Sequence, residues 1–249
     1  MNPTTTITRV LATTALFLLA SASHAHHVWL EQDAQGAKLY FGEFGGNLRE
    51  ASPGLLDRFV KPVAHRITPT GAQPLDIRKT ADGFALAGRA GPGESLVAEE
   101  TAYPPSERRE GDKTVRSLYA PAARLVTTLA AQPPLLTLDL VPTGRQDAQG
   151  VQFQAFYKGL PLAKAKVTVV TPSGWVREET TDAQGHIAVQ LPWRGTYVLE
   201  MNHRDTGPGQ RANGDTWDRA SYVTSLTVMQ PDGLQSLPAP PPAAPNKAN

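Results

Sequence analysis

Short runs of alternating or β-branched apolar residues recur along the whole chain, separated by residues that favour turns. This spacing is typical of β-strands, whose side chains alternate between two faces, and long stretches with helical periodicity are scarce. The 22 prolines and 21 glycines suit the many turns that such a fold needs. In the first half we expect strands at residues 28–30, 37–41, 84–87, 95–98, 125–129 and 135–140.

The best helical candidate is one short segment, residues 52–59, in which Pro53 lies near the start. The second half of the chain continues the strand pattern with closely spaced runs. We expect strands there at residues 151–157, 160–170, 186–191, 196–201 and 221–229. The sequence therefore predicts an all-β protein built from antiparallel β-sandwiches.

Turn formers and polar residues gather at residues 143–150, between the two series of strands. We interpret this segment as a linker, which predicts an N-terminal β-domain at 26–142 and a C-terminal β-sandwich at 151–230. Residues 231–249 form a proline-rich tail, which we expect to be extended and disordered.

The first 25 residues have the pattern of a signal peptide. Arg9 precedes an apolar run at 10–20 that is too short to span a bilayer, and small residues follow it. Cleavage before Ser23 and cleavage before His26 are both compatible with the sequence, and the second lies at the more usual distance from the apolar run. We therefore expect residues 1–25 to be removed and the mature protein to be periplasmic, rather than held by an uncleaved anchor.

Composition excludes several kinds of partner and site. The formal net charge is +1, and Arg9 accounts for it, so the mature chain is neutral and we expect it to bind no nucleic acid. No later apolar run approaches the ~18 residues of a membrane span, so we expect no membrane insertion after processing. The chain has no cysteine, which excludes disulfides, thiolate metal sites and thiol nucleophiles.

Two histidines, His26 and His27, stand at the expected start of the mature chain. A processed N-terminal histidine offers its amine and a ring nitrogen to one ion as a chelate. An adjacent or remote imidazole can then complete a site for Ni, Co, Cu or Zn. The sequence thus indicates a divalent transition-metal site at His26 and His27, with an idle, solvated histidine pair as the alternative.

His203 is the best candidate for a remote metal ligand. Strand alternation places it on the same face as Tyr197, Leu199 and Met201, at the end of an apolar stripe. Glu43 is a further candidate ligand, because the glycines around it let the backbone approach closely.

Several segments together resemble the DUF4198 family, and the resemblance spans the mature chain. The matching residues are 26–31, 159–167, 181–185, 195–203, Trp217 and 225–227. The resemblance implies a periplasmic component associated with nickel or cobalt uptake, with a membrane metal-uptake transporter as its partner. It also implies that the second half is similar to the prealbumin-like or carboxypeptidase-regulatory sandwich. Members often have an acidic residue after the first histidine, where this chain has His27.

The sequence contains no motif that predicts an enzyme. It has no Gly-x-Ser-x-Gly elbow, phosphate loop, dinucleotide fingerprint or His-Glu-x-x-His helix. Three hypotheses remain open: a metal-binding protein for nickel or cobalt uptake, a copper redox protein that uses the N-terminal histidine, and a β-sandwich module that binds protein or carbohydrate.

Overall fold

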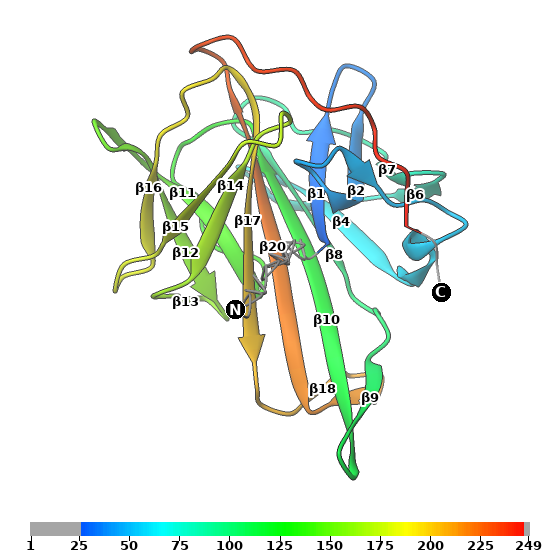
Figure 1. Cartoon of the computed structure of the whole chain (residues 1–249). Helices are drawn as coiled ribbons and strands as arrows, with labels where there is room; N and C mark the ends of the chain where they lie inside the picture. The colour runs from blue at the N-terminus through cyan, green and yellow to red at the C-terminus, as the bar shows by residue number, and fades with distance from the viewer. Residues whose placement is uncertain (1–25, 247–249) are drawn as a thin grey trace, which may run out of the picture.

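The computed structural model describes residues 26–246, and the predicted signal peptide therefore lies outside the described residues. Apart from one short 3₁₀ helix, the regular secondary structure of the described chain consists of β-strands, which confirms the all-β prediction (Figure 1). The strands are β1 (His27–Gln32), β2 (Ala37–Glu43), β3 (Leu48–Arg49), β4 (Pro62–Thr68), β5 (Gly71–Leu75), β6 (Ile77–Thr80), β7 (Gly83–Leu86), β8 (Ser95–Glu100), β9 (Ser106–Glu110), β10 (Lys113–Val126), β11 (Leu138–Asp147), β12 (Gly150–Tyr157), β13 (Leu160–Pro161), β14 (Lys166–Val170), β15 (Val176–Thr180), β16 (His186–Val189), β17 (Gly195–Asp205), β18 (Gly209–Gln210), β19 (Thr216–Trp217) and β20 (Arg219–Gln230).

The segment predicted as a short helix or turn contains a 3₁₀ helix, η1 (Leu55–Arg58). Asp57 closes its first turn, because its carboxylate accepts a hydrogen bond from the Gly54 amide at 2.9 Å. In the part of the chain that the structure describes, no helix is long and apolar enough to cross a membrane.

One long sheet runs through both halves of the molecule. Its strand order is β15-β14-β17-β20-β10-β8-β4-β5, and β9 pairs with β10. All of these pairs are antiparallel except β10 with β20, which run parallel from Ser117↔Arg219 to Leu125↔Thr227. We call this the shared sheet, because strands from the first and the second half of the chain meet at that parallel pair, where the two longest ribbons lie side by side (Figure 1).

A second sheet, β1-β2-β7-β6 with β3 beside β2, covers one face of the shared sheet. Val28 and Leu30 of β1 are buried in one apolar cluster with Ala123 and Leu125 of β10. Trp29, between them on β1, packs against Val198 of β17 and Val170 of β14. This sheet therefore covers the strands on both sides of the parallel pair.

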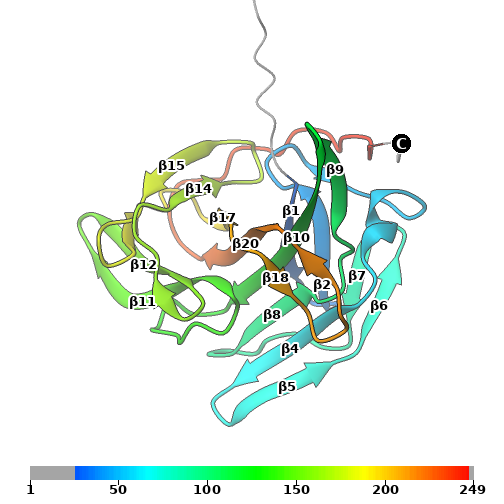
Figure 2. The same cartoon turned by 90° about the horizontal axis from the view of Figure 1, so that it is seen from below.

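A third sheet, β11-β12-β13 with β16 beside β12, covers the opposite face. Leu199 and Met201 of β17 pack in its core with Phe153 of β12, while Val198 faces the other way, toward Trp29. Because side chains alternate along a strand, the two outer sheets lie on opposite faces of the shared sheet. Figure 2 shows the separation, with β11 and β12 to the left and β1, β2 and β7 to the right.

The segment predicted as the linker, residues 143–150, is not the crossing between the two halves. It forms the end of β11 and the turn into β12, and its pairing runs from Leu138↔Tyr157 to Asp147↔Gly150. The strand pairing accommodates part of this segment through an irregularity, a register shift between Pro142 and Gln146. The chain crosses to the third sheet earlier, between the end of β10 and the start of β11.

A buried ion pair holds this crossing. Arg124 on β10 donates to Asp139 on β11 from Nε at 3.0 Å and from Nη2 at 2.6 Å, and both side chains are fully buried. The amides of Leu135 and Leu136 also donate to Asp139 Oδ2, at 2.7 and 3.1 Å. All the donors of this cluster come from the crossing or from β10, so the pair fixes the crossing to the shared sheet.

The proline-rich tail, predicted to be disordered, follows an extended path over the surface as far as the described residues reach. The Leu234 amide donates to the Pro192 carbonyl at 2.9 Å, and the Ala243 amide donates to the Asn47 carbonyl at 3.1 Å. Prolines cannot donate such bonds, so the few other residues of the tail attach it. The sequence predicted an extended and disordered tail at 231–249, and in the structure these hydrogen bonds attach it to the body of the protein.

Candidate functional site

The start of β1 is fixed between the second sheet and the shared sheet. His27 pairs with Gly42 of β2. From the shared sheet, the Tyr119 hydroxyl donates to the His26 carbonyl at 2.9 Å, and the Ser225 hydroxyl donates to the Val28 carbonyl at 2.6 Å. Two side chains of β10 and β20 thus anchor the backbone on either side of His27, which gives both histidines a rigid base.

His26 pairs with a buried carboxylate. Its Nε2 lies 2.5 Å from Glu50 Oε1, and the Glu50 side chain is 0% exposed. The His26 ring also packs against Phe41, with ring centroids 5.2 Å apart. Glu50 follows β3 directly, and its amide donates to the Phe41 carbonyl at 2.8 Å, so backbone pairing positions the carboxylate under the ring.

The tail supplies the other partner of Glu50. The Asn246 side-chain Nδ2 donates to Glu50 Oε1 at 2.7 Å, and the Asn246 amide donates to Oε2 at 3.0 Å. Nδ2 also lies 3.1 Å from His26 Nε2. We call the three residues His26, Glu50 and Asn246 the His26 site. A fully buried carboxylate needs such partners, because an unpaired charge away from water is costly.

His27 faces a different carboxylate. Its Nδ1 lies 3.6 Å from Glu200 Oε2, and both side chains are nearly buried. Glu200 and Glu43 line one cleft of about 210 Å³ between the second sheet and the shared sheet, which we call the glutamate cleft. Burial raises the pKa of Glu200 to about 7, and the nearby charge of Glu43 adds to the rise.

The two adjacent histidines serve opposite sides of the strand. Successive side chains of a strand point to opposite faces, so His26 turns toward Phe41 and Glu50 while His27 turns toward Glu200. Among residues 26–246, no group of three or more His, Asp or Glu side chains is arranged to hold a metal ion. An ion at either position would therefore need a donor beyond these side chains.

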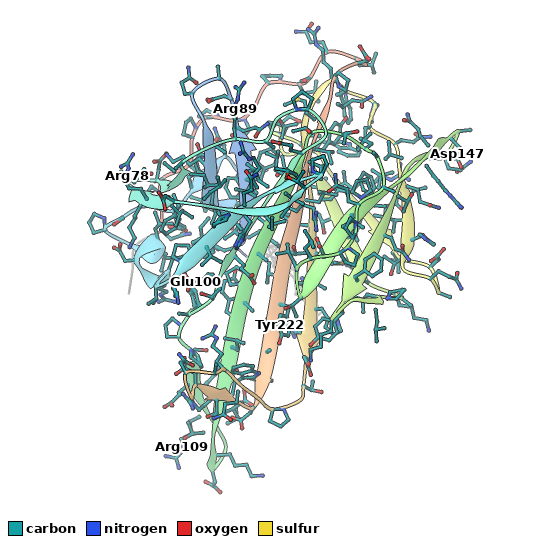
Figure 3. All side chains as sticks on the ribbon, turned by 180° about the vertical axis from the view of Figure 1, so that it is seen from behind. Arg78, Arg89, Glu100, Arg109, Asp147 and Tyr222 are labelled. Atoms are coloured by element: carbon teal, nitrogen blue, oxygen red, sulfur yellow. The ribbon has the colours of Figure 1, made fainter. Side chains whose placement is uncertain are left out.

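His203 does not lie with the other candidate ligands. It is on the face of β17 that carries Leu199 and Met201, as the sequence predicted, but that face is covered by the third sheet. Its ring packs against Tyr157 of β12, with centroids 4.3 Å apart, and it pairs across the sheet with Tyr222, labelled in Figure 3. Burial lowers the pKa of His203. His203 was the candidate remote ligand, but it lies on the face of β17 opposite Glu200, which is the β17 residue that faces His27. The structure therefore does not bring His203 to His26 or His27.

Of the residues at the start of β1 and in the glutamate cleft, His26, His27 and Glu43 were predicted from the sequence, whereas Glu50, Glu200 and Asn246 were not. Glu200 carried only a weak signal, because its face of the strand holds one apolar residue, Val198, between Thr196 and Glu200 itself. Glu50 and Asn246 carried none, because only the fold brings them to His26.

No protein-family model matches the chain, and a search of the curated proteins finds no match either. What the start of β1 can do chemically thus follows from its own residues. It combines an imidazole bonded to a buried carboxylate with a second imidazole beside a carboxylate pair, all on anchored backbone.

Proposed function

We propose that the mature protein binds one divalent transition-metal ion at His26, and that it does so in the periplasm for a nickel or cobalt uptake system. The observation that carries the proposal is the short contact between His26 Nε2 and the buried carboxylate of Glu50. Histidines that bind metals commonly donate their second ring N–H to a carboxylate, which fixes the tautomer and makes the ring more basic. With Nε2 turned to Glu50, Nδ1 is the ring nitrogen that binds the ion.

The second donor is the amine that signal-peptide cleavage before His26 would create. Amine and Nδ1 of one residue form a chelate, and nitrogen donors suit Ni, Co, Cu and Zn. This donor set also agrees with the lack of a ready-made group of three His, Asp or Glu among the described residues. The choice of nickel or cobalt, and of a membrane transporter as partner, is supported by the resemblance at residues 26–31 and by the other matching segments.

The test begins with the intact mass of the purified mature protein, which must start at His26. Calorimetric titration with Ni²⁺ should then give one site. His26→Ala should abolish binding, and Glu50→Gln should weaken it about tenfold or more, because outer carboxylates orient the ligand. His203→Ala is the matched control and should leave binding unchanged. A chain that starts at His26 and releases no heat with Ni²⁺, Co²⁺, Cu²⁺ or Zn²⁺ would overturn the proposal.

The glutamate cleft is a second candidate location for the same ion. It is favoured by the two carboxylates, Glu43 and Glu200, that share the cleft with His27 close by. Oxygen ligands with one imidazole also suit divalent ions. Loss of Ni²⁺ binding in Glu200→Gln, with binding retained in His26→Ala, would move the site to the cleft. The reverse result keeps it at His26.

A further inference from the structure

The described part of the C-terminal tail, residues 231–246, joins the far end of the chain to the His26 site. We call it the strap. Figure 1 shows it in red, running from the end of β20 across the molecule toward β7 and β6. Nearly all of its residues are exposed, so little apolar burial holds it in place.

Three sets of hydrogen bonds attach the strap. At its start, Leu234 exchanges backbone bonds with Pro192 and Arg194, both at 2.9 Å. In its middle, the Asn47 side chain donates to the Pro240 carbonyl at 2.8 Å, beside the bond from Ala243 to the Asn47 carbonyl. At its end lie the bonds from Asn246 to Glu50.

The last attachment differs from the others because it reaches a buried charge. Among the described residues, the Glu50 side chain accepts one hydrogen bond from His26 and two from Asn246, so the strap supplies two of these three bonds. Hydrogen bonds to charged groups are stronger than neutral ones. The strap therefore combines weak, exposed attachment along its length with one strong contact at the end, which is how a segment that opens locally is built.

We propose that the strap is a closing element of the His26 site. Docked, it shields the His26–Glu50 pair and holds the carboxylate toward the ring. Released, it lets water and solutes reach both. A role for the strap in controlling metal binding rests on the proposed function. The closing of the strap over His26 and Glu50 does not depend on any metal.

The closure is tested without metal, by the rate at which diethyl pyrocarbonate modifies His26, read by mass spectrometry. The mature chain, a chain ending at Gln230 and Asn246→Ala are compared. Deletion of the strap should raise the rate about tenfold, because the bonds to a charged group are lost. Asn246→Ala should give a smaller rise, since its amide still reaches Glu50.

Two controls separate local opening from general loosening. His186, half-buried on β16, is modified in the same samples and should react at one rate throughout. Asn213→Ala removes a similar asparagine, whose Nδ2 donates to Asp215 at 2.9 Å in a distant loop, and should change nothing at His26. An unchanged His26 rate in the chain ending at Gln230 would overturn the strap as a closing element.

The consequence for an ion is measured by EDTA challenge of nickel-loaded protein. Loss of the strap should speed release of Ni²⁺ about tenfold, in line with the faster modification of His26. If the full mature chain takes up no Ni²⁺, the proposed function fails while the modification rates still decide the strap. If Ni²⁺ is released equally fast with and without the strap, the strap is not a gate.

Discussion

The crossing at Arg124 and the start of β1 both bury carboxylates beside the shared sheet, but they compensate them differently. Asp139 meets a guanidinium in two parallel hydrogen bonds and two backbone amides besides. Glu200 meets Glu43 across the glutamate cleft, with His27 at 3.6 Å, and the pKa of Glu200 rises to about 7. The first arrangement is complete and structural. In the glutamate cleft, two carboxylates lie together without a matching positive charge among the described residues that line it, and a bound cation or a proton would reduce their repulsion.

Removing the cation from the complete arrangement should have the largest effect. Arg124→Met leaves Asp139 buried with its charge uncompensated, which is expected to cost about 3–5 kcal/mol in the free energy of unfolding. Urea denaturation at pH 7 measures it. The double variant Arg124→Met with Asp139→Leu should recover most of the loss, because no buried charge remains. Equal stability of the single variant and the wild type would contradict this interpretation.

Neutralising Glu200 should stabilise the metal-free protein at high pH. The folded pKa of about 7 lies above the ordinary value of 4.5, so the folded state keeps a proton that the unfolded chain has released. The stability that this proton provides is present below pH 4.5 and is lost as the pH rises toward and through 7, by roughly 3 kcal/mol in all.

Glu200→Gln should therefore flatten the pH dependence of unfolding between pH 4.5 and 8 and be the more stable form at pH 8. Glu178→Gln, which changes a carboxylate more than half exposed on β15, is the control and should follow the wild type. Parallel pH profiles for wild type and Glu200→Gln would show that the excess charge is not felt.

Adding an ion should stabilise the start of β1 and not the crossing. Ni²⁺ at a free concentration 100 times its Kd is expected to raise the free energy of unfolding by about 2.7 kcal/mol. The gain should disappear in His26→Ala and persist in His203→Ala, and thermal denaturation with and without Ni²⁺ reads it directly. A gain of the same size in His26→Ala would place the ion elsewhere.

The smallest effect is expected from removing the charge of Glu43, which is the second cause of the raised pKa of Glu200. Glu43→Gln removes the neighbouring charge but leaves the burial, so the pKa of Glu200 should fall and stay above 4.5. Carboxyl carbon shifts of Glu200 in an NMR titration measure it. An unchanged titration would mean that burial alone sets the pKa.

The strand content and part of the site could be predicted because both depend on local pattern. Alternation identified β1, β2, β7 and β8 and most strands of the second half, but it missed β4, β5, β6, β9 and nearly all of β10. The position after the predicted signal peptide singled out His26 and His27. Alternation also assigned His203 to its correct face of β17, but the sheet that covers that face could not be known, and it proved to be the third sheet. The same alternation places the side chains of His26 and His27 on opposite faces of the strand, although the two residues are adjacent in the sequence.

What could not be predicted depends on register between distant strands. Glu50 reaches His26 because β3 pairs with β2, and Asn246 reaches Glu50 because a tail without helical or strand pattern lies on Asn47. The linker was misplaced for a related reason. Turn formers at 143–150 mark a hairpin as well as they mark a boundary, and only the pairing of β11 with β12 distinguishes the two.

The parallel pairing of β10 with β20 has a consequence for how the chain acquires its structure. The parallel pairing at the centre of the shared sheet joins residues that are about a hundred positions apart, from Ser117 with Arg219 to Leu125 with Thr227, so it cannot form until the chain has been made as far as β20. Such high contact order favours slow, all-or-none folding, with the two halves completing one another. A chain cut between β11 and β12 would leave β10 and β20 as long open edges, each a template for aggregation.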